Sequence, residues 1–177
     1  DAEGQAAFDR MAGVRSHADG AALGQVYVRM FNNPGVAEAV GALGEHLRFH
    51  GVLPDALREA VILHYAVRQR YGFVWAHHQR PARQAGLSED DIAAITAGDV
   101  PGSLPDATLA ALEVVDAVVE HRSVPADVQA RLVDAHGTAG AVEVVAVCGL
   151  YALMGYTTIA YDVAVEPGLP TPPTPPF

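Results

Sequence analysis

The sequence predicts an all-α fold, and three observations favour this class. Apolar residues recur at spacings of three and four, whereas the polar/apolar alternation typical of strands is scarce. Alanine, the residue with the highest helix propensity, is abundant. Half of the 177 residues are hydrophobic and 18% are charged, which is too apolar for a disordered chain. A chain of this length is expected to form one domain with a sizeable core.

Turn signals divide the first part of the chain into helices. The turn sequence NNPG at 32–35 ends a helix predicted over 21–32. A second helix is expected over 36–49, ending near Gly51. Pro54 opens a third helix, because the N–H that proline lacks would be unpaired in a first turn anyway.

Glycine and proline also mark the helices of the middle of the chain. A fourth helix is predicted from Gly72 to about Ala85, and Pro81 within it is expected to kink or split it. The sequence SEDD at 88–91 is similar to a capping box and begins a short helix that ends near Gly98.

Three more helices are predicted after a loop at 99–105. They are expected over 106–121, 126–136 and 140–162, with Pro125 opening the second and Gly137 closing it. The last contains an uncharged stretch at 144–161, close to the ~18 residues of a membrane span. Polar residues within it and the lack of flanking Lys or Arg argue against a span. We expect a buried helix that also makes subunit contacts.

The C-terminal segment differs in composition from the rest. Residues 1–166 are predicted to form a single helical domain, and 167–177 a Pro-rich tail that holds six of the twelve prolines. Such a segment favours extended polyproline II structure. We expect the tail to dock on its own or a neighbouring subunit.

Charge and cysteine content exclude several classes of function. The formal net charge of −10 argues against nucleic acid or an anionic membrane surface as a partner. The single cysteine, Cys148, cannot form an internal disulfide or a Cys-His zinc site. The N-terminal sequence lacks the basic and apolar regions of a signal peptide. We therefore expect a cytoplasmic protein.

Glu59 and His78 are the strongest candidates for chemistry. Glu59 shares a helix face with an apolar stripe, an unusual place for a carboxylate unless it is paired. An imidazole beside a carboxylate can move a proton near neutral pH. His77 is adjacent to His78, so the two are expected to face different sites. His46 and His50 have a metal-like spacing, but nothing nearby supports a ligand set, and we expect no metal and no cofactor.

The sequence around this pair resembles the carboxymuconolactone decarboxylase and alkylhydroperoxidase family. The segments LREAVILHYA (57–66) and YGFVWAHHQRPARQAGLSEDDI (71–92), together with VEPGLP near the C-terminus, carry the resemblance. In the AhpD-like peroxidases of this family, a glutamate precedes a CxxCxxxH motif. Counting back from His78 places the two cysteine positions at Tyr71 and Val74, so cysteine-pair peroxidase activity is excluded.

The chain is more similar to the decarboxylase-like branch, where the stretch often reads YEWxxH. Trp75 and His78 match this motif, whereas Val74 replaces its acidic residue. The resemblance implies an all-α, AhpD-like helical bundle in which a helical hairpin carries the site. It also implies homo-oligomers, commonly trimers or hexamers, with sites near subunit interfaces.

The leading hypothesis is a cofactor-independent acid/base enzyme, a lyase or isomerase acting on a small organic acid, lactone or related carbonyl compound. His78 would be the general base or acid, and Glu59 would orient it or relay the proton. Residues expected to bind substrate are Trp75, Tyr71, Val74 and Arg83, with Arg83 preferred over Arg58, Arg68, Arg70 and Arg80 as the cation for a carboxylate.

Two alternatives remain open from the sequence. One is a non-catalytic oligomeric binding or scaffold protein that retains the fold. The other is a thiol-dependent peroxidase that uses Cys148, whose apolar neighbours disfavour the reactive thiolate. The shape and lining of the cavity at His78 would distinguish between two classes of substrate. An arginine at one end of the cavity indicates a carboxylate, and an entirely apolar lining indicates a neutral compound.

Overall fold

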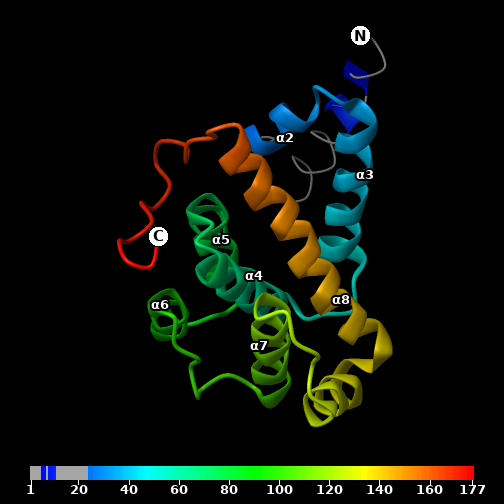
Figure 1. Ribbon diagram of the computed structural model, residues 1–177, viewed down its shortest axis with the longest axis vertical. Helices are drawn as coiled ribbons and strands as arrows, with labels where there is room; N and C mark the ends of the chain where they lie inside the picture. The colour runs from blue at the N-terminus through cyan, green and yellow to red at the C-terminus, as the bar shows by residue number, and fades with distance from the viewer. Residues whose placement is uncertain (1–4, 7, 11–23) are drawn as a thin grey trace.

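The computed structural model describes residues 5–6, 8–10 and 24–177, and these contain helices and no β-strand (Figure 1). The all-α prediction is therefore confirmed. The helices are α2 (Gln25–Met30), α3 (Pro34–Glu45), η1 (His46–His50), α4 (Asp55–Gln69), α5 (Gly72–Gln84), α6 (Glu89–Ala97), α7 (Asp106–Val119) and α8 (Ala126–Ala160).

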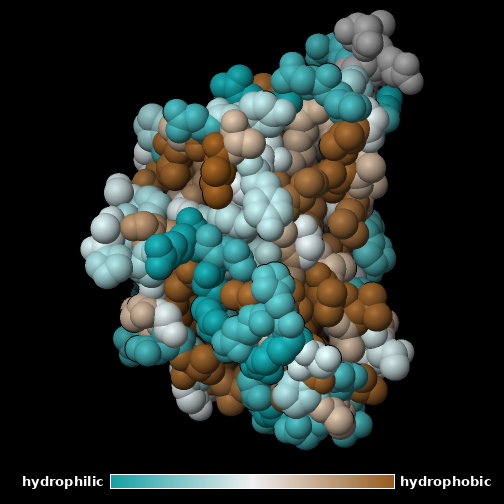
Figure 2. Space-filling model, viewed as in Figure 1, coloured by the Kyte–Doolittle hydropathy of each residue, from teal (hydrophilic) through white to brown (hydrophobic). Residues whose placement is uncertain are grey.

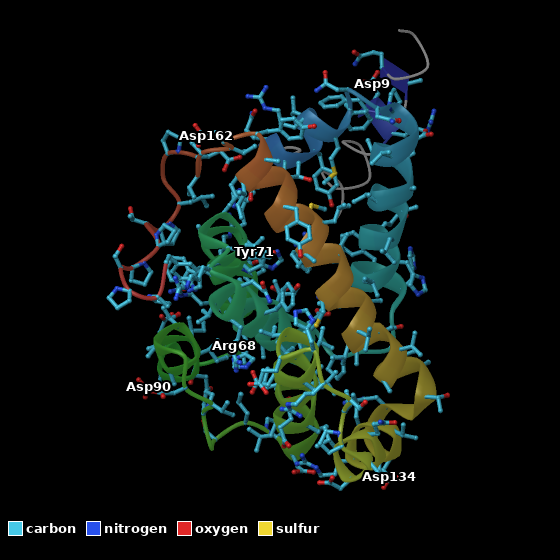
Figure 3. The ribbon with its side chains drawn as sticks, in the orientation of Figure 1. Asp9, Arg68, Tyr71, Asp90, Asp134 and Asp162 are labelled. Atoms are coloured by element: carbon cyan, nitrogen blue, oxygen red, sulfur yellow. The ribbon has the colours of Figure 1, made fainter. Side chains whose placement is uncertain are left out.

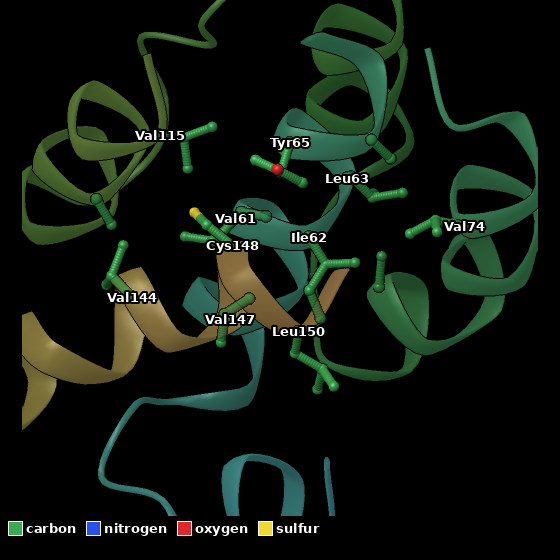
Figure 4. Close-up of a cluster of buried hydrophobic side chains, with 14 of the residues drawn as sticks. Val61, Ile62, Leu63, Tyr65, Val74, Val115, Val144, Val147, Cys148 and Leu150 are labelled. Atoms are coloured by element: carbon green, nitrogen blue, oxygen red, sulfur yellow. The ribbon is translucent and has the colours of Figure 1, made fainter. Parts of the chain in front are cut away.

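Helix α4 lies at the centre of the fold. Every residue from Leu57 to Val67 is buried, and α5, α6, α7 and α8 pack around it. Figure 4 shows Val61 of α4, Val115 of α7 and Val147 of α8 in one cluster of buried side chains. Burial of each such aliphatic side chain stabilises the fold by roughly 1.5–3 kcal/mol. This core fixes the position of α4, and with it Glu59.

The first helices differ from prediction at their boundaries. The predicted helix over 21–32 corresponds to α2 at Gln25–Met30, and its residues 21–23 lie outside the described residues. The second helix begins at Pro34 rather than 36, because the Asn33 side chain accepts a hydrogen bond from the Val36 N–H. Its last turn widens into the π-helix η1 and ends before Gly51.

Pro81 was expected to kink or split α5, and the structure contradicts the split. The helix runs from Gly72 to Gln84, and the turn after the proline is intact, with Ala85 N donating to Pro81 O at 2.8 Å. Proline removes one hydrogen bond of the helix, and the remaining bonds and the packing on α4 hold it.

Helix α6 begins and ends as predicted. Ser88 and Asp91 form a reciprocal capping box, and the helix ends at Gly98, whose φ of 90° suits a residue without a Cβ. Helix α7 ends at Val119, two residues before the predicted end.

Helix α8 joins the last two predicted helices. Gly137 interrupts it with φ 69° and ψ 176°, close to the predicted break. Its length and apolarity also fit a membrane span, a test that the core helix of a soluble protein passes too. Here α8 packs against α4, α5 and α7, and crosses the molecule beside α3 (Figure 1).

The tail docks on its own chain. It runs from the end of α8 past α5 towards α6 (Figure 1). The Phe177 ring lies 5.6 Å from that of Trp75, between centroids. Pro172 packs so closely on Gly72 that a Cβ there would lie 2.9 Å from it. The expectation of a docked tail is confirmed for the described chain.

Candidate functional site

The consecutive helices α4 and α5 form a hairpin that brings Glu59 and His78 together. Arg70 ends α4 in the left-handed conformation, with φ 59°, and reverses the chain into α5. Across the hairpin, His78 Nδ1 lies 2.7 Å from Glu59 Oε2. Because an ionised carboxylate only accepts hydrogen bonds, Nδ1 carries the proton and donates it. In neutral His78, Nε2 is then the basic nitrogen.

Burial differs between the two partners. The Glu59 side chain is 3% exposed, whereas that of His78 is 12% exposed. The His78 ring meets Tyr151 of α8 edge-on, with centroids 4.9 Å apart. Glu59 is therefore sealed behind the imidazole, and His78 is the member of the pair that small molecules can reach.

A second cation compensates the charge of Glu59. Arg58 Nη2 lies 3.7 Å from Glu59 Oε1, while Arg58 Nη1 pairs with Asp55 at 2.9 Å. A buried carboxylate without such partners would be strongly destabilising. The expectation that interior Glu59 must be paired is thus met by both Arg58 and His78.

His78 lines a cavity of about 530 Å³. The cavity lies between α2, α5, the end of η1, the C-terminal half of α8 and the start of the tail. Its lining comprises Gly24, Gln25, Val26, Tyr27, Arg48, Phe73, Val74, His77, His78, Arg80, Pro81, Gln84, Tyr151, Met154, Glu166, Pro167 and Leu169. The volume suits a small organic molecule.

The cavity combines apolar walls with charged side chains, which are two arginines and Glu166. Phe73, Val74 and Met154 provide apolar surface, and Arg48 and Arg80 provide guanidinium groups. Arg80 forms no ion pair with any residue in the described parts of the chain. Guanidinium groups in such a position favour a carboxylate ligand.

His77 also lines this cavity, so the prediction that the adjacent histidines face different sites is wrong. Its Nδ1 lies 2.8 Å from the Phe73 carbonyl, and its ring stacks on Phe73 at 4.0 Å. Its Nε2 lies 2.9 Å from Oε2 of Glu166, the residue just before the tail. The cavity spans enough of the α5 surface to include both side chains, and His77 connects helix to tail there.

Trp75 and Arg83 do not lie with His78. Both line a different cavity, between α5, α6 and the tail. Trp75 Nε1 donates to Thr96 Oγ1 at 2.9 Å, and Arg83 pairs with Glu89. Trp75 shares a helical spacing with His78, but α6 packs on its side of α5 and draws the indole away. Of the four expected substrate-binding residues, the structure places only Val74 at the His78 cavity.

Tyr71 is also absent from the lining of the His78 cavity. It lies between α5 and α8 (Figure 3), with its ring 6.1 Å from those of Tyr65 and Tyr156. Burial is the main reason that the pKa of Tyr71 is raised and that of Tyr65 rises to about 12. This buried hydroxyl is a packing element rather than a donor to a bound substrate.

Cys148 is buried in the core of α8 and α4 (Figure 4). Burial raises the pKa of its thiol to about 12, so the thiolate is scarce at neutral pH. The thiol lines neither cavity. This position disfavours the alternative of a Cys148 peroxidase.

Among the described residues, no group of three or more His, Cys, Asp or Glu side chains is arranged to hold a metal ion. His46 and His50 lie on η1 and approach different glutamates, Glu143 at 3.9 Å and Glu45 at 3.8 Å. The arrangement at His78 is therefore that of a proton-handling pair beside an arginine-lined cavity.

Sequence reasoning missed Tyr151, Arg48 and Glu166 as neighbours of His78. They come from α8, η1 and the segment that follows α8, all outside the α4–α5 hairpin. The VEPGLP segment, which contains Glu166, offered the only signal, and it indicated resemblance without a location.

The helical hairpin and its Glu–His pair define an AhpD-like all-α protein. The family model "Carboxymuconolactone decarboxylase family" matches residues 34–117, which include both residues of the pair. Over this segment the chain matches the family that its motifs resemble. A comparison with curated proteins gives no match.

Solved structures share the fold at low sequence identity. A cysteine-to-alanine variant of the debrominase Bmp8, in complex with 2,3,4-tribromopyrrole, is 17% identical with a TM-score of 0.75, covering 90% of this chain and 86% of that one. Apo Bmp8 is 16% identical, with a TM-score of 0.70 and coverage of 93% and 85%. A protein of unknown function from Agrobacterium tumefaciens, described as a candidate antioxidant defence protein AhpD, is 20% identical, with a TM-score of 0.63 and coverage of 76% and 93%.

Proposed function

We propose that this protein is a cofactor-independent acid/base enzyme, a lyase or isomerase of the decarboxylase-like kind. Its substrate is a small organic acid, lactone or related carbonyl compound. The observation that carries this proposal is the 2.7 Å contact between His78 and Glu59 at the edge of a cavity of about 530 Å³. The match of residues 34–117 to the carboxymuconolactone decarboxylase family model supports it.

We infer different roles for the two residues. His78 Nε2 removes a proton from the carbon next to the substrate carbonyl, and the C–H electron pair moves into the carbonyl to give an enolate. Glu59 holds the tautomer with Nδ1 protonated and stabilises the imidazolium that forms. Return of the proton to another carbon completes an isomerisation.

A decarboxylation uses the same pair from the protonated state. The bond between the carboxylate carbon and its neighbour breaks, CO₂ leaves, and the electron pair remains on the substrate as an enolate. Protonated His78 then supplies the proton to carbon. The transferred proton thus starts on His78 in the decarboxylation and on the substrate in the isomerisation. In both reactions Glu59 orients His78 and stabilises its protonated form.

The arginines favour an acid as substrate. Arg80 and Arg48 line the cavity that contains His78, and Val74 and Met154 line its apolar part. Arg80 thus replaces Arg83 as the proposed cation for a carboxylate. Val74 leaves the cavity without the acidic residue of the family motif, so proton transfer depends on His78.

A related structure supports binding of a small molecule. The debrominase Bmp8 variant of similar fold binds 2,3,4-tribromopyrrole. Debromination itself is not proposed for this chain, because low identity supports the fold alone. The shared architecture is consistent with a pocket that accepts small molecules.

The alternative function is a non-catalytic oligomeric binding or scaffold protein. Tyr71 and Val74 at the two cysteine positions of the peroxidase motif favour it. The exposure of His78 to a cavity favours the enzyme, since a binding protein that had lost its chemistry has no need of a reachable base paired to a buried carboxylate.

We also propose a homo-oligomer, a trimer or hexamer. Hydrophobic side chains gather on the surface over α3 and α8 (Figure 2). On α8, Val142, Val145, Tyr156 and Ile159 are exposed, at the spacing of one helix face. Sedimentation of Ile159→Glu, with exposed Val100→Glu as control, tests this: a smaller species is expected only for Ile159→Glu, and unchanged sedimentation contradicts it.

Deuterium exchange tests the proposed chemistry without knowledge of the natural substrate. Levulinate, a small keto acid, and γ-valerolactone are incubated with the protein in D₂O, and NMR follows deuterium uptake next to the carbonyl. His78→Ala is expected to abolish exchange, and exposed His50→Ala to retain it. Equal exchange by wild type and His78→Ala refutes the role of His78, and binding without exchange by wild type favours the scaffold alternative.

A further inference from the structure

A second cavity lies on the other side of α5, separate from His78. It has a volume of about 420 Å³ and lies between α5, α6 and the tail. Its lining comprises Trp75, Gln79, Arg83, Glu89, Ile92, Ala93, Thr96, Ala97, Pro173 and Pro175, none of which lines the His78 cavity. The proposed reaction uses none of these side chains.

Gln79 lines this cavity and carries an unpaired, buried hydrogen-bond donor. The residue is 3% exposed, and its Nε2 has no partner among the described residues. Arg83 Nη2 lies 3.4 Å from Gln79 Oε1, which fixes the amide with its oxygen towards the guanidinium and its NH₂ away from it. Because an unmade hydrogen bond of a buried group is costly, a ligand acceptor at Nε2 would be stabilised.

The other polar groups of the cavity floor are already paired. Trp75 Nε1 donates to Thr96 Oγ1 at 2.9 Å, and Thr96 Oγ1 donates to the Ile92 carbonyl at 2.7 Å. These bonds hold the indole in place as part of the wall. Ligand specificity therefore depends on the Gln79 amide and on apolar contact.

The walls favour a flat apolar body. The Trp75 ring, Ile92 and two tail prolines, Pro173 and Pro175, contribute to the lining. Phe177 supports Trp75 at 5.6 Å between ring centroids. Aromatic and proline surfaces of this kind stack on planar rings.

The charge at the cavity is balanced. Arg83 is paired with Glu89, whose Oε2 lies 3.0 Å from Arg83 Nη2. The remaining donor, the Gln79 amide, is neutral. A neutral carbonyl group fits this arrangement better than a carboxylate, because a carboxylate would compete with Glu89 for the guanidinium.

We propose that this cavity is a second binding site, for a small aromatic molecule with a neutral carbonyl group, an aromatic amide or lactone, which accepts a hydrogen bond from Gln79 Nε2 while its ring packs on Trp75. The site is independent of the proposed chemistry at His78.

Trp75 is the only tryptophan of the chain, so its fluorescence reports directly on this cavity. Benzamide is the probe, titrated into the full-length protein. We expect saturable quenching or a spectral shift, and Gln79→Leu is expected to weaken the apparent affinity about 3- to 10-fold, as loss of one hydrogen bond implies. Gln69→Leu, on α4 and away from both cavities, is the matched control and is expected to bind as wild type does.

A second ligand, a second variant and a folding control complete the titration. Benzoate is expected to bind more weakly than benzamide, and tighter binding of benzoate overturns the neutral-carbonyl assignment. His78→Ala is expected to retain the Trp75 response, and its loss there would place the ligand in the other cavity. Thermal unfolding checks that Gln79→Leu is folded. No Trp75 response in wild type, or equal affinity in folded Gln79→Leu, overturns the site.

Discussion

Replacement of Glu59 by glutamine tests the role of the buried carboxylate most directly. The amide keeps the size of the side chain and removes its charge. In wild type, His78 Nδ1 donates to Glu59 Oε2 at 2.7 Å, and the Glu59 side chain is 3% exposed. The imidazolium that forms when His78 takes a proton is therefore stabilised by a short, poorly screened, charge-assisted hydrogen bond.

The expected loss of rate follows from the free energy that this hydrogen bond contributes. A hydrogen bond to a charged group contributes about 1.5–3 kcal/mol. Since about 1.4 kcal/mol corresponds to a factor of ten in rate, Glu59→Gln is expected to lower the rate of deuterium exchange about 10- to 150-fold. The effect should fall on the rate constant rather than on substrate affinity, because Glu59 lies behind His78 and lines no cavity.

The assay is levulinate exchange in D₂O for wild type, both single variants and the double variant with His78→Ala. If Glu59 acts through His78, Glu59→Gln causes no further loss in the His78→Ala background. Glu143→Gln is the matched control, because Glu143 is also buried but caps the Val52 and Leu53 N–H groups. Independent, additive losses, or a wild-type rate in Glu59→Gln, refute the reasoning.

Three further predictions concern the cavity, the core and the thiol. Arg80→Gln is expected to raise the KM for levulinate about tenfold with little change in kcat and to leave γ-valerolactone unaffected; equal effects on both compounds contradict a carboxylate contact. Gly155→Ala is expected to lower the free energy of unfolding by about 1–3 kcal/mol in urea, because a Cβ there overlaps the Tyr71 ring, whereas Gly149→Ala, with open space around it, should be neutral or stabilising; similar stability of the two variants would contradict this packing. Burial raises the pKa of Cys148 from 9.0 to about 12, so the folded state binds a proton that the unfolded state releases: this contribution to stability is complete below pH 9 and is lost as pH rises towards 12. Thiol titration should accordingly find Cys148 unreactive at neutral pH until the protein unfolds, and rapid labelling of the folded protein would show the burial to be wrong.

Local chemistry explains which elements the sequence could predict. The ends of α6 follow from the Ser88–Asp91 capping box and from Gly98, since both act within one turn of the helix. The break in α8 follows from Gly137 in the same way. The possible split at Pro81 did not occur, because whether a helix survives a proline depends on the packing around that helix as well as on its sequence.

The residues of the candidate site likewise fall into those that the local sequence predicts and those that depend on tertiary packing. The motif in the sequence predicted Glu59 and His78, and their pairing needs only the two neighbouring helices of one hairpin. Part of the cavity lining comes from α5 itself, but the rest comes from α2, η1, α8 and the segment after α8. Helical spacing placed Trp75 on the His78 face, yet packing of α6 drew the indole into a separate cavity.

The sequence alone determined the helical class, most helix ends, the family and the Glu59–His78 pair, because each depends on residues close in the chain or on a contiguous motif. Only the tertiary structure decided which side chains surround that pair. It brought Arg48 and Tyr151 to the His78 cavity and placed Trp75 and Arg83 in the cavity of Gln79. A cavity is enclosed by several elements whose relative positions follow from core packing, and no local pattern encodes those positions.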